Sequence, residues 1–497
     1  MDPSYTYCTN FLFKFLPGFF FLCMISCPES TFGNKSDCLA LLDFKRRITE
    51  DPFHIMKSWN DSVDLCSWVG VTCNHANKRV VILNLEAQKL VGSIPPSIGN
   101  LTYLTGINLK GNNFHGEIPQ EIGRLLGLQY LTLSSNSFGG KIPANISHCT
   151  QLRMLNIGVN KLIGSIPNQL NSLLNLTHFL VGKNNLTGTI PDWIGNFSSL
   201  YAISLGDNNF EGSIPNVLGR LTSLGIFVLQ SNKLSGTVPS SIYNISSIYL
   251  FAVTQNQLHG ELPQNVGTTL PNLELFAGGV NKFTGSIPVS LSNASKLQFL
   301  DFAENGLTGK FPAENFGTLK GLVRLNFDDN RLGSGKTGDL SSLSFLANCT
   351  NLEVLSFSRN RFGGELPESI GNLSTKLRIF TMGGNLLHGS FPTRVVNLVN
   401  LINLGMEQNY LGDDEDVEDD DDGDGYGNKI RERPLAKYKD PGPDKAKRLE
   451  ECLYSVIQIG ISCSAISPGE RMRMDVVVNK MGALRDSYLN LRRRRRR

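Results

Sequence analysis

Apolar and polar residues follow one another along most of this chain in a pattern that returns at a fixed spacing. One unit of the pattern places Leu128, Leu131 and Leu133 before Asn136 and Phe138. The asparagine returns almost always 24 residues later. It stands at Asn112, Asn136, Asn160, Asn184, Asn208, Asn232, Asn256, Asn281, Asn305, Asn330, Asn360, Asn385 and Asn409. Because Leu131 and Leu133 are two residues apart, a short strand places both on one face. The pattern therefore predicts one strand in each unit.

This period and this order of residues are typical of a leucine-rich-repeat solenoid. Each unit is then one coil, and its strand pairs in parallel with the strands of the neighbouring coils. We expect the repeated asparagine to turn inward, where its amide satisfies backbone groups that would otherwise be unpaired. Gly140 and Pro143 suit the bend and the convex side that follow. One coil cannot bury its apolar face alone, so stability arises between neighbours.

The repeats number about fourteen when an atypical first coil, with Gln88 at the asparagine position, is included. The regular spacing breaks between Asn330 and Asn360, where the step is 30 residues. We expect this insertion to bulge from one face of the solenoid.

The N-terminus carries a short apolar run from Phe11 to Ser26, followed by small and polar residues. This order predicts a secretory signal peptide over residues 1–30. A membrane anchor or a buried helix is the alternative, but Lys14 and Pro17 interrupt the run, which is short for a membrane span.

Eleven N-x-S/T sequons agree with passage through the secretory pathway. They predict glycosylation at Asn34, Asn60, Asn100, Asn145, Asn175, Asn185, Asn196, Asn244, Asn293, Asn348 and Asn372. Asparagine-rich repeats also generate sequons by chance, so we do not expect every site to be occupied.

The segment between the apolar run and the repeats predicts a cap over the first coil. Asp37 is placed to cap a helix whose Leu41, Phe44 and Ile48 share one face. Cys66 and Cys73 are close enough in sequence to close a small loop, and an oxidising compartment favours a disulfide between them. Trp59 and Trp68 would complete the cap. For Cys149 and Cys349, inside the repeats, free buried thiols are the expected state.

The composition changes after Leu411. From Asp413 on, ten of twelve residues are acidic, which predicts a disordered, solvated linker over 413–444. No apolar run of about 18 residues follows the repeats, so the sequence predicts no membrane-spanning helix there. Six arginines at 492–497 could attract nucleic acid or an anionic membrane. For a secretory chain, we interpret them instead as a mis-assigned terminus.

Residues 36–412 resemble the ectodomain of plant leucine-rich-repeat receptor-like serine/threonine kinases. The Leu-x-Gly-x-Ile-Pro repeat ends and the pattern of Trp59, Cys66, Trp68 and Cys73 carry this resemblance. The insertion and the segment 365–374 further resemble the large immune receptors for bacterial elicitors. The resemblance implies an α/β repeat solenoid of the plant-type superhelix, with a disulfide cap over 31–76 and repeats over 77–412. It also implies an extracellular peptide or protein ligand, a co-receptor leucine-rich-repeat kinase, and membrane attachment in the intact family.

Residues 445–491 resemble the last helices of the same family's kinase domain. The resemblance implies that Arg471 matches an arginine that pairs with the glutamate of an Ala-Pro-Glu motif. The sequence contains no Ala-Pro-Glu, no glycine-rich phosphate loop with its lysine, no His-Arg-Asp loop and no Asp-Phe-Gly motif. Phosphoryl transfer needs these groups together. We therefore expect no kinase activity and interpret the segment as a short helical remnant in a truncated chain.

Other motifs do not indicate further chemistry. Residues 333–337 resemble the end of a phosphate loop, but its first glycine would fall on Asn330. Residues 420–425 begin like a calcium loop whose twelfth residue is Arg431 instead of glutamate. The net charge of +3 suggests no polyanionic partner, and the seven histidines are scattered. We expect no cofactor, no metal, no catalytic residues and no nucleic acid.

Function is predicted on the concave strands, where residues between the buried leucines project outward. The residues six places before the repeated asparagines form a stripe: Tyr130, Met154, His178, Ala202, Ile226, Leu250, Leu275, Phe299, Arg324 and Val354. Neighbouring positions add Tyr201, Tyr249, Asp301, Glu304, Asp328 and Asp329. Aromatic residues and arginine beside acids are typical of protein-binding surfaces. We predict ligand contacts from Tyr130, Met154, His178, Tyr201, Tyr249, Phe299, Arg324, Asp328 and Asp329. Alternatively, some of these side chains merely pack on each other.

These features favour a non-catalytic ectodomain that senses or sequesters an extracellular ligand, in pathogen or signal perception. The alternative is a secreted inhibitor of a cell-wall-degrading hydrolase, because plant polygalacturonase inhibitors resemble this repeat and cap. A truncated receptor fragment without function is a third hypothesis. We expect the secretory pathway and the apoplast, or the plasma membrane if the intact receptor is the product.

Overall fold

A computed structural model describes residues 35–60 and 63–411. The predicted signal peptide, Asn34, the acidic linker, the kinase-like segment and the arginine tail lie outside these residues. The described chain divides into two compact units. The first contains residues up to 311 together with 326–331, and the second contains 312–325 and the residues from 332 on. Within the described ranges, no helix is long and apolar enough to cross a membrane.

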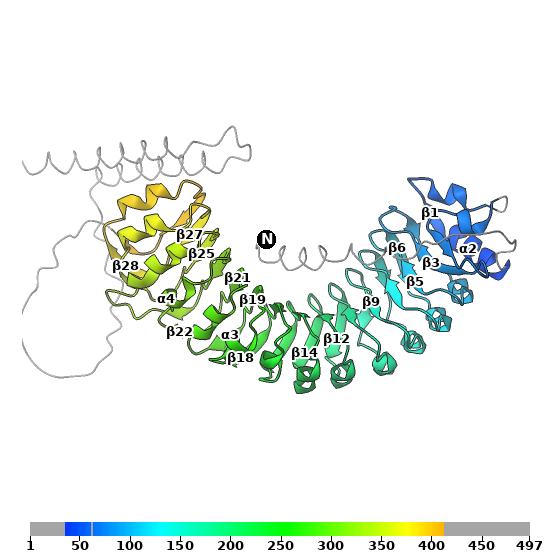
Figure 1. The fold of residues 1–497 in the computed structure, drawn as a ribbon, viewed down its shortest axis with the longest axis horizontal. Helices are drawn as coiled ribbons and strands as arrows, with labels where there is room; N and C mark the ends of the chain where they lie inside the picture. Colours follow the sequence, from blue (N-terminus) through cyan, green and yellow to red (C-terminus); the bar gives the residue numbers. More distant parts are fainter. Residues whose placement is uncertain (1–34, 61–62, 412–497) are drawn as a thin grey trace, which may run out of the picture. The chain divides into compact units, whose positions relative to one another are not determined.

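The first unit is a stack of coils, each of which contributes one short strand to a parallel sheet (Figure 1). The strands follow one another in chain order: β2 (Val71–Cys73), β3 (Val80–Asn84), β5 (Gly106–Asn108), β7 (Tyr130–Thr132), β9 (Met154–Asn156), β11 (His178–Leu180), β13 (Ala202–Ser204), β15 (Ile226–Val228), β17 (Leu250–Ala252), β19 (Leu275–Ala277) and β21 (Phe299–Asp301). β2 pairs with β3 in antiparallel fashion, and the pairs from β3 onward are parallel. The predicted parallel-strand solenoid is confirmed.

A second set of short strands follows the strand of the first sheet in each coil. It comprises β4 (Val91–Gly92), β6 (Asn113–Glu117), β8 (Ser137–Gly139), β10 (Ile163–Gly164), β12 (Asn185–Thr189), β14 (Asn209–Ser213), β16 (Lys233–Thr237), β18 (Gln257–Glu261), β20 (Lys282–Thr284) and β22 (Thr308–Gly309). β1 (Ile48–Glu50) comes before β2 in the cap and pairs with β4 in antiparallel fashion. β12 to β20 pair in parallel in one sheet. We call this side of the coil the second-sheet flank.

Short helices complete each coil on the side away from the first sheet (Figure 1). They are α2 (Lys35–Arg46), η1 (Ile55–Ser58), η2 (Leu65–Ser67), η3 (Pro96–Asn100), η4 (Gln120–Arg124), η5 (Ala144–His148), η6 (Asn168–Ser172), η7 (Asp192–Asn196), η8 (Asn216–Arg220), η9 (Ile242–Asn244), α3 (Val266–Thr269) and η10 (Val289–Asn293). Most of the η elements are single 3-10 turns preceded by proline, whose fixed φ suits the start of a helix.

The repeated asparagines hold adjacent coils together, as predicted. The Asn136 side-chain amide donates to the carbonyl of Leu109 at 2.9 Å and to that of Leu133 at 3.0 Å. Its Oδ1 accepts the Phe114 N–H at 2.9 Å. The next asparagine repeats these contacts one coil further on, where Asn160 donates to Leu133 O. Each amide therefore satisfies buried backbone groups of two coils.

Stacked phenylalanines fill the core of the middle coils. The ring centroids of Phe227 and Phe251 are 5.1 Å apart, those of Phe251 and Phe276 are 5.2 Å apart, and those of Phe276 and Phe302 are 4.8 Å apart. These distances lie in the favourable range for aromatic pairs. The core therefore runs continuously from coil to coil within the first unit.

The N-terminal cap matches its prediction in part. A disulfide joins Cys66 to Cys73, and the Trp59 and Trp68 rings stack at 5.4 Å. The prediction that Asp37 caps the helix is wrong, because Asp37 lies inside the first turn of α2 and is fully buried. Its carboxylate accepts hydrogen bonds from Arg79 Nε at 2.9 Å and Arg79 Nη2 at 2.8 Å. This two-pronged contact satisfies the buried charge better than a helix end would.

The end of α2 also differs from its prediction. Leu41 and Phe44 are buried on one face, as expected, but the helix ends at Arg46 and Ile48 begins β1. β1 pairs with β4, so Ile48 contributes to a sheet and not to the helix face.

Two cysteines inside the repeats are buried thiols, as predicted. Cys149 Sγ donates to Ile122 O at 3.3 Å, and Cys349 Sγ donates to Phe316 O at 3.4 Å. Burial raises the pKa of the Cys149 thiol to about 12 and that of Cys349 to about 11. Both thiols therefore stay protonated and unreactive.

The second unit contains the same kind of coil. Its elements are α4 (Ala313–Phe316), η11 (Ser341–Asn348), β25 (Val354–Ser356), β26 (Gly363–Glu365), η12 (Glu368–Asn372), β27 (Ile379–Thr381), β28 (Leu386–Gly389), η13 (Thr393–Asn397), β29 (Asn403–Gly405) and β30 (Tyr410–Leu411). β23 (Arg324–Asn326) and β24 (Arg331–Leu332) lie where the chain passes between the units. β25, β27 and β29 pair in parallel, and so do β26, β28 and β30.

The insertion contains a longer 3-10 helix and a loop held by hydrogen bonds. Part of it lengthens η11, whose Leu343 and Leu346 are buried. The Asp339 carboxylate accepts hydrogen bonds from the N–H groups of Ser334 at 2.8 Å and of Gly363 at 3.0 Å. These contacts lower the pKa of Asp339 against the opposing effect of burial, which is the largest single influence. The loop is therefore tied to the neighbouring coil by a charge-assisted contact.

Candidate functional site

The register of the first sheet brings the predicted stripe together in the first unit. Tyr130 is the Cα partner of Met154, and Met154 is the partner of His178. The column continues through Ala202, Ile226, Leu250, Leu275 and Phe299. Adjacent strands lie about 4.8 Å apart, so these residues form one column on the concave face.

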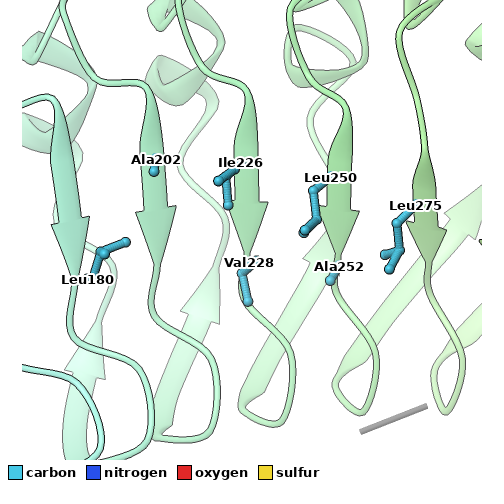
Figure 2. Close-up of a cluster of buried hydrophobic side chains, with 7 residues drawn as sticks. All are labelled: Leu180, Ala202, Ile226, Val228, Leu250, Ala252 and Leu275. Carbon is cyan, nitrogen blue, oxygen red and sulfur yellow. The ribbon is translucent and has the colours of Figure 1, made fainter. Parts of the chain in front are cut away.

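The centre of this column is buried, and this differs from the exposed stripe that the sequence suggested. Figure 2 shows the side chains that gather there from neighbouring strands of the first sheet: Leu180, Ala202, Ile226, Val228, Leu250, Ala252 and Leu275. All seven are less than 9% exposed, and Tyr249, Ala277 and Phe299 pack against them. The physical reason is that two outward positions per strand are apolar in these coils. In these central coils, the side chains of the stripe pack on each other, which was the alternative interpretation of the sequence pattern.

Two tyrosines stand beside this apolar cluster and contact each other. The Tyr201 hydroxyl donates to the Tyr249 hydroxyl at 3.3 Å, and their ring centroids are 6.3 Å apart. Gly225 lies between them in the chain of coils. A Cβ atom at Gly225 would lie 2.8 Å from Tyr249 Cε1 and 3.0 Å from Tyr201 Cε2. The absence of a side chain there lets the two rings close over the intervening strand.

The surroundings of Tyr249 favour its neutral hydroxyl. Burial, the hydrogen bond with Tyr201 and the nearby Glu274 carboxylate all raise the pKa of Tyr249. Tyr201 itself is 42% exposed. The pair therefore presents a partly exposed tyrosine hydroxyl group and an aromatic face to solvent.

His178 extends the aromatic group on the same face. Its ring centroid lies 5.7 Å from that of Tyr201. The Thr177 hydroxyl donates to Arg153 O at 2.9 Å, and the same oxygen lies 2.9 Å from His178 Nδ1. The donor and acceptor roles in the contact between Thr177 and His178 Nδ1 depend on the tautomer of the ring. Burial lowers the pKa of His178, which favours the neutral ring.

Acidic residues lie at the ends of the last strands of the first unit. Asp301 Oδ2 accepts a hydrogen bond from Asn326 Nδ2 at 3.0 Å. Asp328 and Asp329 are partly exposed, and Asp329 has a φ of 53° in the turn before Asn330. Their carbonyl oxygens accept from Glu304 N and Asn305 N, so the backbone fixes both positions.

The remaining predicted contacts occupy separate places. Tyr130, Met154 and Phe299 are half-buried at the two ends of the column. Arg324 begins β23 in the second unit and is also half-buried. In the part of the chain that the structure describes, no group of three or more His, Cys, Asp or Glu side chains is placed to hold a metal ion.

Two contributors were missed by the sequence analysis. Gly225 permits the tyrosine contact, and the Thr177 hydroxyl lies 2.9 Å from His178 Nδ1. Both stand seven places before a repeated asparagine, in a column that was sampled only at its tyrosines. A comparison of this position from coil to coil would have revealed that Gly225 lies between Tyr201 and Tyr249.

The cap and the repeats each match a known family description. The leucine-rich-repeat N-terminal domain matches residues 34–74, and the leucine-rich repeat matches residues 103–125, 127–149, 175–197 and 351–373. The chain therefore carries a leucine-rich-repeat cap and leucine-rich repeats.

Relatives of this leucine-rich-repeat protein include plant receptor-like kinases. It is 46% identical to the LRR receptor-like serine/threonine-protein kinase EFR of Arabidopsis thaliana over 77 residues, which are 15% of this chain and 8% of that kinase. It is 34% identical to Polygalacturonase inhibitor 1 of Arabidopsis thaliana over 106 residues, 21% of this chain and 29% of the inhibitor. The aligned segments thus span a small part of either relative.

A solved structure shares the fold over a longer stretch. The ectodomain of the Arabidopsis receptor kinase HAESA, solved with an IDA peptide hormone ligand, superimposes with a TM-score of 0.57 and 25% identity. The match covers 76% of this chain and 73% of the HAESA chain. The structural neighbour is therefore a plant receptor ectodomain, as the resemblance implied.

Proposed function

We propose that this leucine-rich-repeat protein binds an extracellular peptide or protein ligand on the concave face of its first unit. The observation that carries the proposal is the group formed by His178, Tyr201 and Tyr249 beside the buried apolar cluster. Aromatic side chains with polar tips contribute most of the energy in many protein interfaces. The peptide hormone in the HAESA structure supports a ligand of the same class.

The geometry indicates what the ligand offers at this group. His178 contacts the Thr177 hydroxyl through Nδ1, and the Tyr249 hydroxyl accepts from Tyr201. We expect a polar group of the ligand to hydrogen-bond to the imidazole, while an apolar or aromatic ligand side chain covers the tyrosine rings. Tyr130, Met154 and Phe299 would contact the ligand at the ends of the column, and Asp328 and Asp329 would supply charged contacts. A ligand contact from Arg324, in the second unit, stays a separate prediction.

The biological setting belongs to the same proposal. The protein passes through the secretory pathway, acts in pathogen or signal perception, and catalyses no reaction itself. A leucine-rich-repeat co-receptor joins the complex, and membrane attachment belongs to the intact receptor. Inhibition of a cell-wall-degrading hydrolase is the second candidate, which the similarity to Polygalacturonase inhibitor 1 favours.

A displayed library of random short peptides, selected on the secreted full chain, tests the binding face. Peptides that bind the parent protein should lose at least about tenfold in affinity, roughly 1.4 kcal/mol, with Tyr201→Ala or Tyr249→Ala. Tyr103→Ala is the matched control, because Tyr103 is 48% exposed and stacks under Arg79 in the region of the cap. Equal binding by all variants would contradict the concave-face assignment.

Titration of the protein against a secreted polygalacturonase tests the second candidate function. An unchanged hydrolysis rate would exclude inhibition of that enzyme.

A further inference from the structure

The last described coil leaves apolar side chains in solvent at positions that earlier coils bury. Leu404 is the middle residue of β29 and is 40% exposed, whereas its partner Phe380 in β27 is fully buried. Phe391 is exposed, and Leu366, at the same place one coil earlier, is buried. The 3-10 turn of this coil, η13, contains no buried residue. We call the surface formed by Phe391, Val396 and Leu404 the end surface.

The backbone of this coil also has a neighbour on one side only. Among the described residues, β29 is the last strand of the first sheet and β30 is the last strand of its own sheet. Leu387 N donates to Asn409 Oδ1 at 3.1 Å, as the same N–H of earlier coils does to the next asparagine. The residue 24 places after Asn409 is Arg433, so the sequence does not continue this ladder. Strand edges and apolar faces of this kind pair with another segment.

The end surface does not suit a further turn packed as closely as those before it. The fourth residue of η12 is Gly371, where a Cβ atom would lie 2.3 Å from Arg394 O in η13. The fourth residue of η13 is Val396, which is 42% exposed. A turn placed on η13 as η13 is placed on η12 would collide with this side chain. The occupant therefore packs differently from another coil of the same kind.

Charge disfavours a second copy of the chain as the occupant. An acidic run begins at Asp413, directly after β30, and ten of its first twelve residues are acidic. Two copies joined through their end surfaces would bring the starts of two such runs to one junction. Like charges repel strongly within the screening length of about 8 Å at physiological ionic strength.

A later segment of the same chain has the complementary chemistry. Residues 452–467 contain four isoleucines and no charged residue. They lie outside the described residues, within a stretch from 445 to 497 that has thirteen lysines and arginines and five acidic residues. This stretch therefore attracts the acidic run. About 50 residues rarely bury a sufficient core by themselves, so the isoleucines gain from a second apolar surface.

The connection between the two surfaces is short enough for an intramolecular contact. Forty residues separate Leu411 from Cys452. A flexible chain of that length has a root-mean-square span of about 35 Å. Its first residue leaves from the end coil itself, so the segment stays near the end surface. A flexible tether of this kind gives an effective concentration on the order of millimolar, which favours the segment over a separate molecule.

We propose that residues 452–467 dock on the end surface of their own chain and cover Phe391, Val396 and Leu404. The segment replaces solvent over the exposed apolar side chains and the free edges of β29 and β30. The acidic run then lies beside the basic residues that flank the segment. A chain closed in this way offers no strand edge for end-to-end association with other copies. The inference requires neither the ligand nor the location in the proposed function.

Photo-crosslinking of the full chain tests the contact. Tyr410→benzoylphenylalanine places a crosslinker in β30, on a side chain that is 71% exposed. Leu126→benzoylphenylalanine is the matched control, on an exposed side chain of the first unit. In a mixture of isotope-labelled and unlabelled chains, the Tyr410 crosslinker should link to residues 452–467 of its own chain, and the Leu126 crosslinker should not. Links between different chains would identify a second copy as the occupant and overturn the proposal. Equal linking from both positions, or none to these residues, would also overturn it.

Amide hydrogen exchange provides an independent test that leaves the end surface unchanged. Ile457→Asp combined with Ile459→Asp should raise the exchange rate of residues 403–411 severalfold, because β29 and β30 lose their cover. Val476→Asp combined with Val478→Asp adds the same charges outside the docking segment and should keep the rate of the parent. Equal rates in the parent and both variants would contradict the docking. Peptide binding to the concave face of the first unit should be the same in all three proteins, so this result and the ligand assignment are tested separately.

Discussion

The hydroxyl groups of Tyr201 and Tyr249 meet at 3.3 Å although the two residues lie two coils apart. The contact spans the strand of Gly225, whose missing side chain leaves the rings room to approach. The contact between the two tyrosines on the concave face thus depends on Gly225, which has no side chain.

This contact should appear as energetic coupling between the two hydroxyl groups. Tyr201→Phe and Tyr249→Phe each remove one partner of a hydrogen bond whose net value is about 0.5–1.5 kcal/mol. In a double-mutant cycle measured by urea unfolding, the coupling should be about 0.5–1 kcal/mol. Additive effects of the two changes would show that the hydroxyl groups do not interact in solution.

Asn208 should be among the residues that matter most for stability. Its amide donates to Val181 O and Leu205 O, and its Oδ1 accepts from Leu186 N. Asn208→Ala leaves these buried backbone groups without partners and should lower the free energy of unfolding by about 2–4 kcal/mol. Asn209→Ala, one residue further on, should lower it by less than about 1 kcal/mol. Denaturant titration of both variants checks the difference, and similar losses would contradict the role of the repeated asparagine.

The ion pair of Arg79 with Asp37 should contribute far more than a surface pair. Arg79→Met leaves the fully buried Asp37 charge uncompensated, which costs about 3–5 kcal/mol. Lys110→Met breaks a pair with Glu86 whose side chains are 28% and 41% exposed, and should cost less than about 1 kcal/mol. Thermal unfolding compares the two. If Arg79→Met matched Lys110→Met, the buried pair would not anchor the cap.

His178 should make the fold less stable as the solution becomes mildly acidic. Its pKa is lowered by burial, so the unfolded chain binds a proton at a higher pH than the folded chain. The neutral ring contributes fully to the free energy of unfolding above the unfolded-state pKa of about 6.5. This contribution declines as the pH falls toward the lower pKa of the folded state. The urea midpoint between about pH 7.5 and 5 should fall less in His178→Gln than in the parent. An identical slope in both proteins would exclude this linkage.

The pattern of leucines and asparagines was sufficient to predict the coils, their parallel pairing and the role of Asn136. The period of the side chains fixes which residues face inward, so these features follow from local sequence. The buried centre of the stripe did not follow in the same way. Leu250 is buried in one cluster with Leu180, Val228 and Ala252, which all stand four places before a repeated asparagine but come from three different coils.

The cap shows a second limit of local sequence. Asp37 precedes an apolar face and has the chemistry of a helix cap, but Arg79 is placed beside it by the antiparallel pairing of β2 with β3. A partner 42 residues away therefore decides the role of the carboxylate. Such a long-range pair is not visible in the pattern around Asp37.

The register of the first sheet has a consequence for how the protein can change over evolutionary time. Tyr130, Met154 and His178 are successive partners, and each lies 24 residues after the one before. Removing or duplicating a segment of that length between equivalent points would leave each remaining strand opposite a strand of the same kind. Unequal exchange between copies of the repeat can therefore shorten or lengthen the binding face in a single genetic event, without a new folding problem to solve.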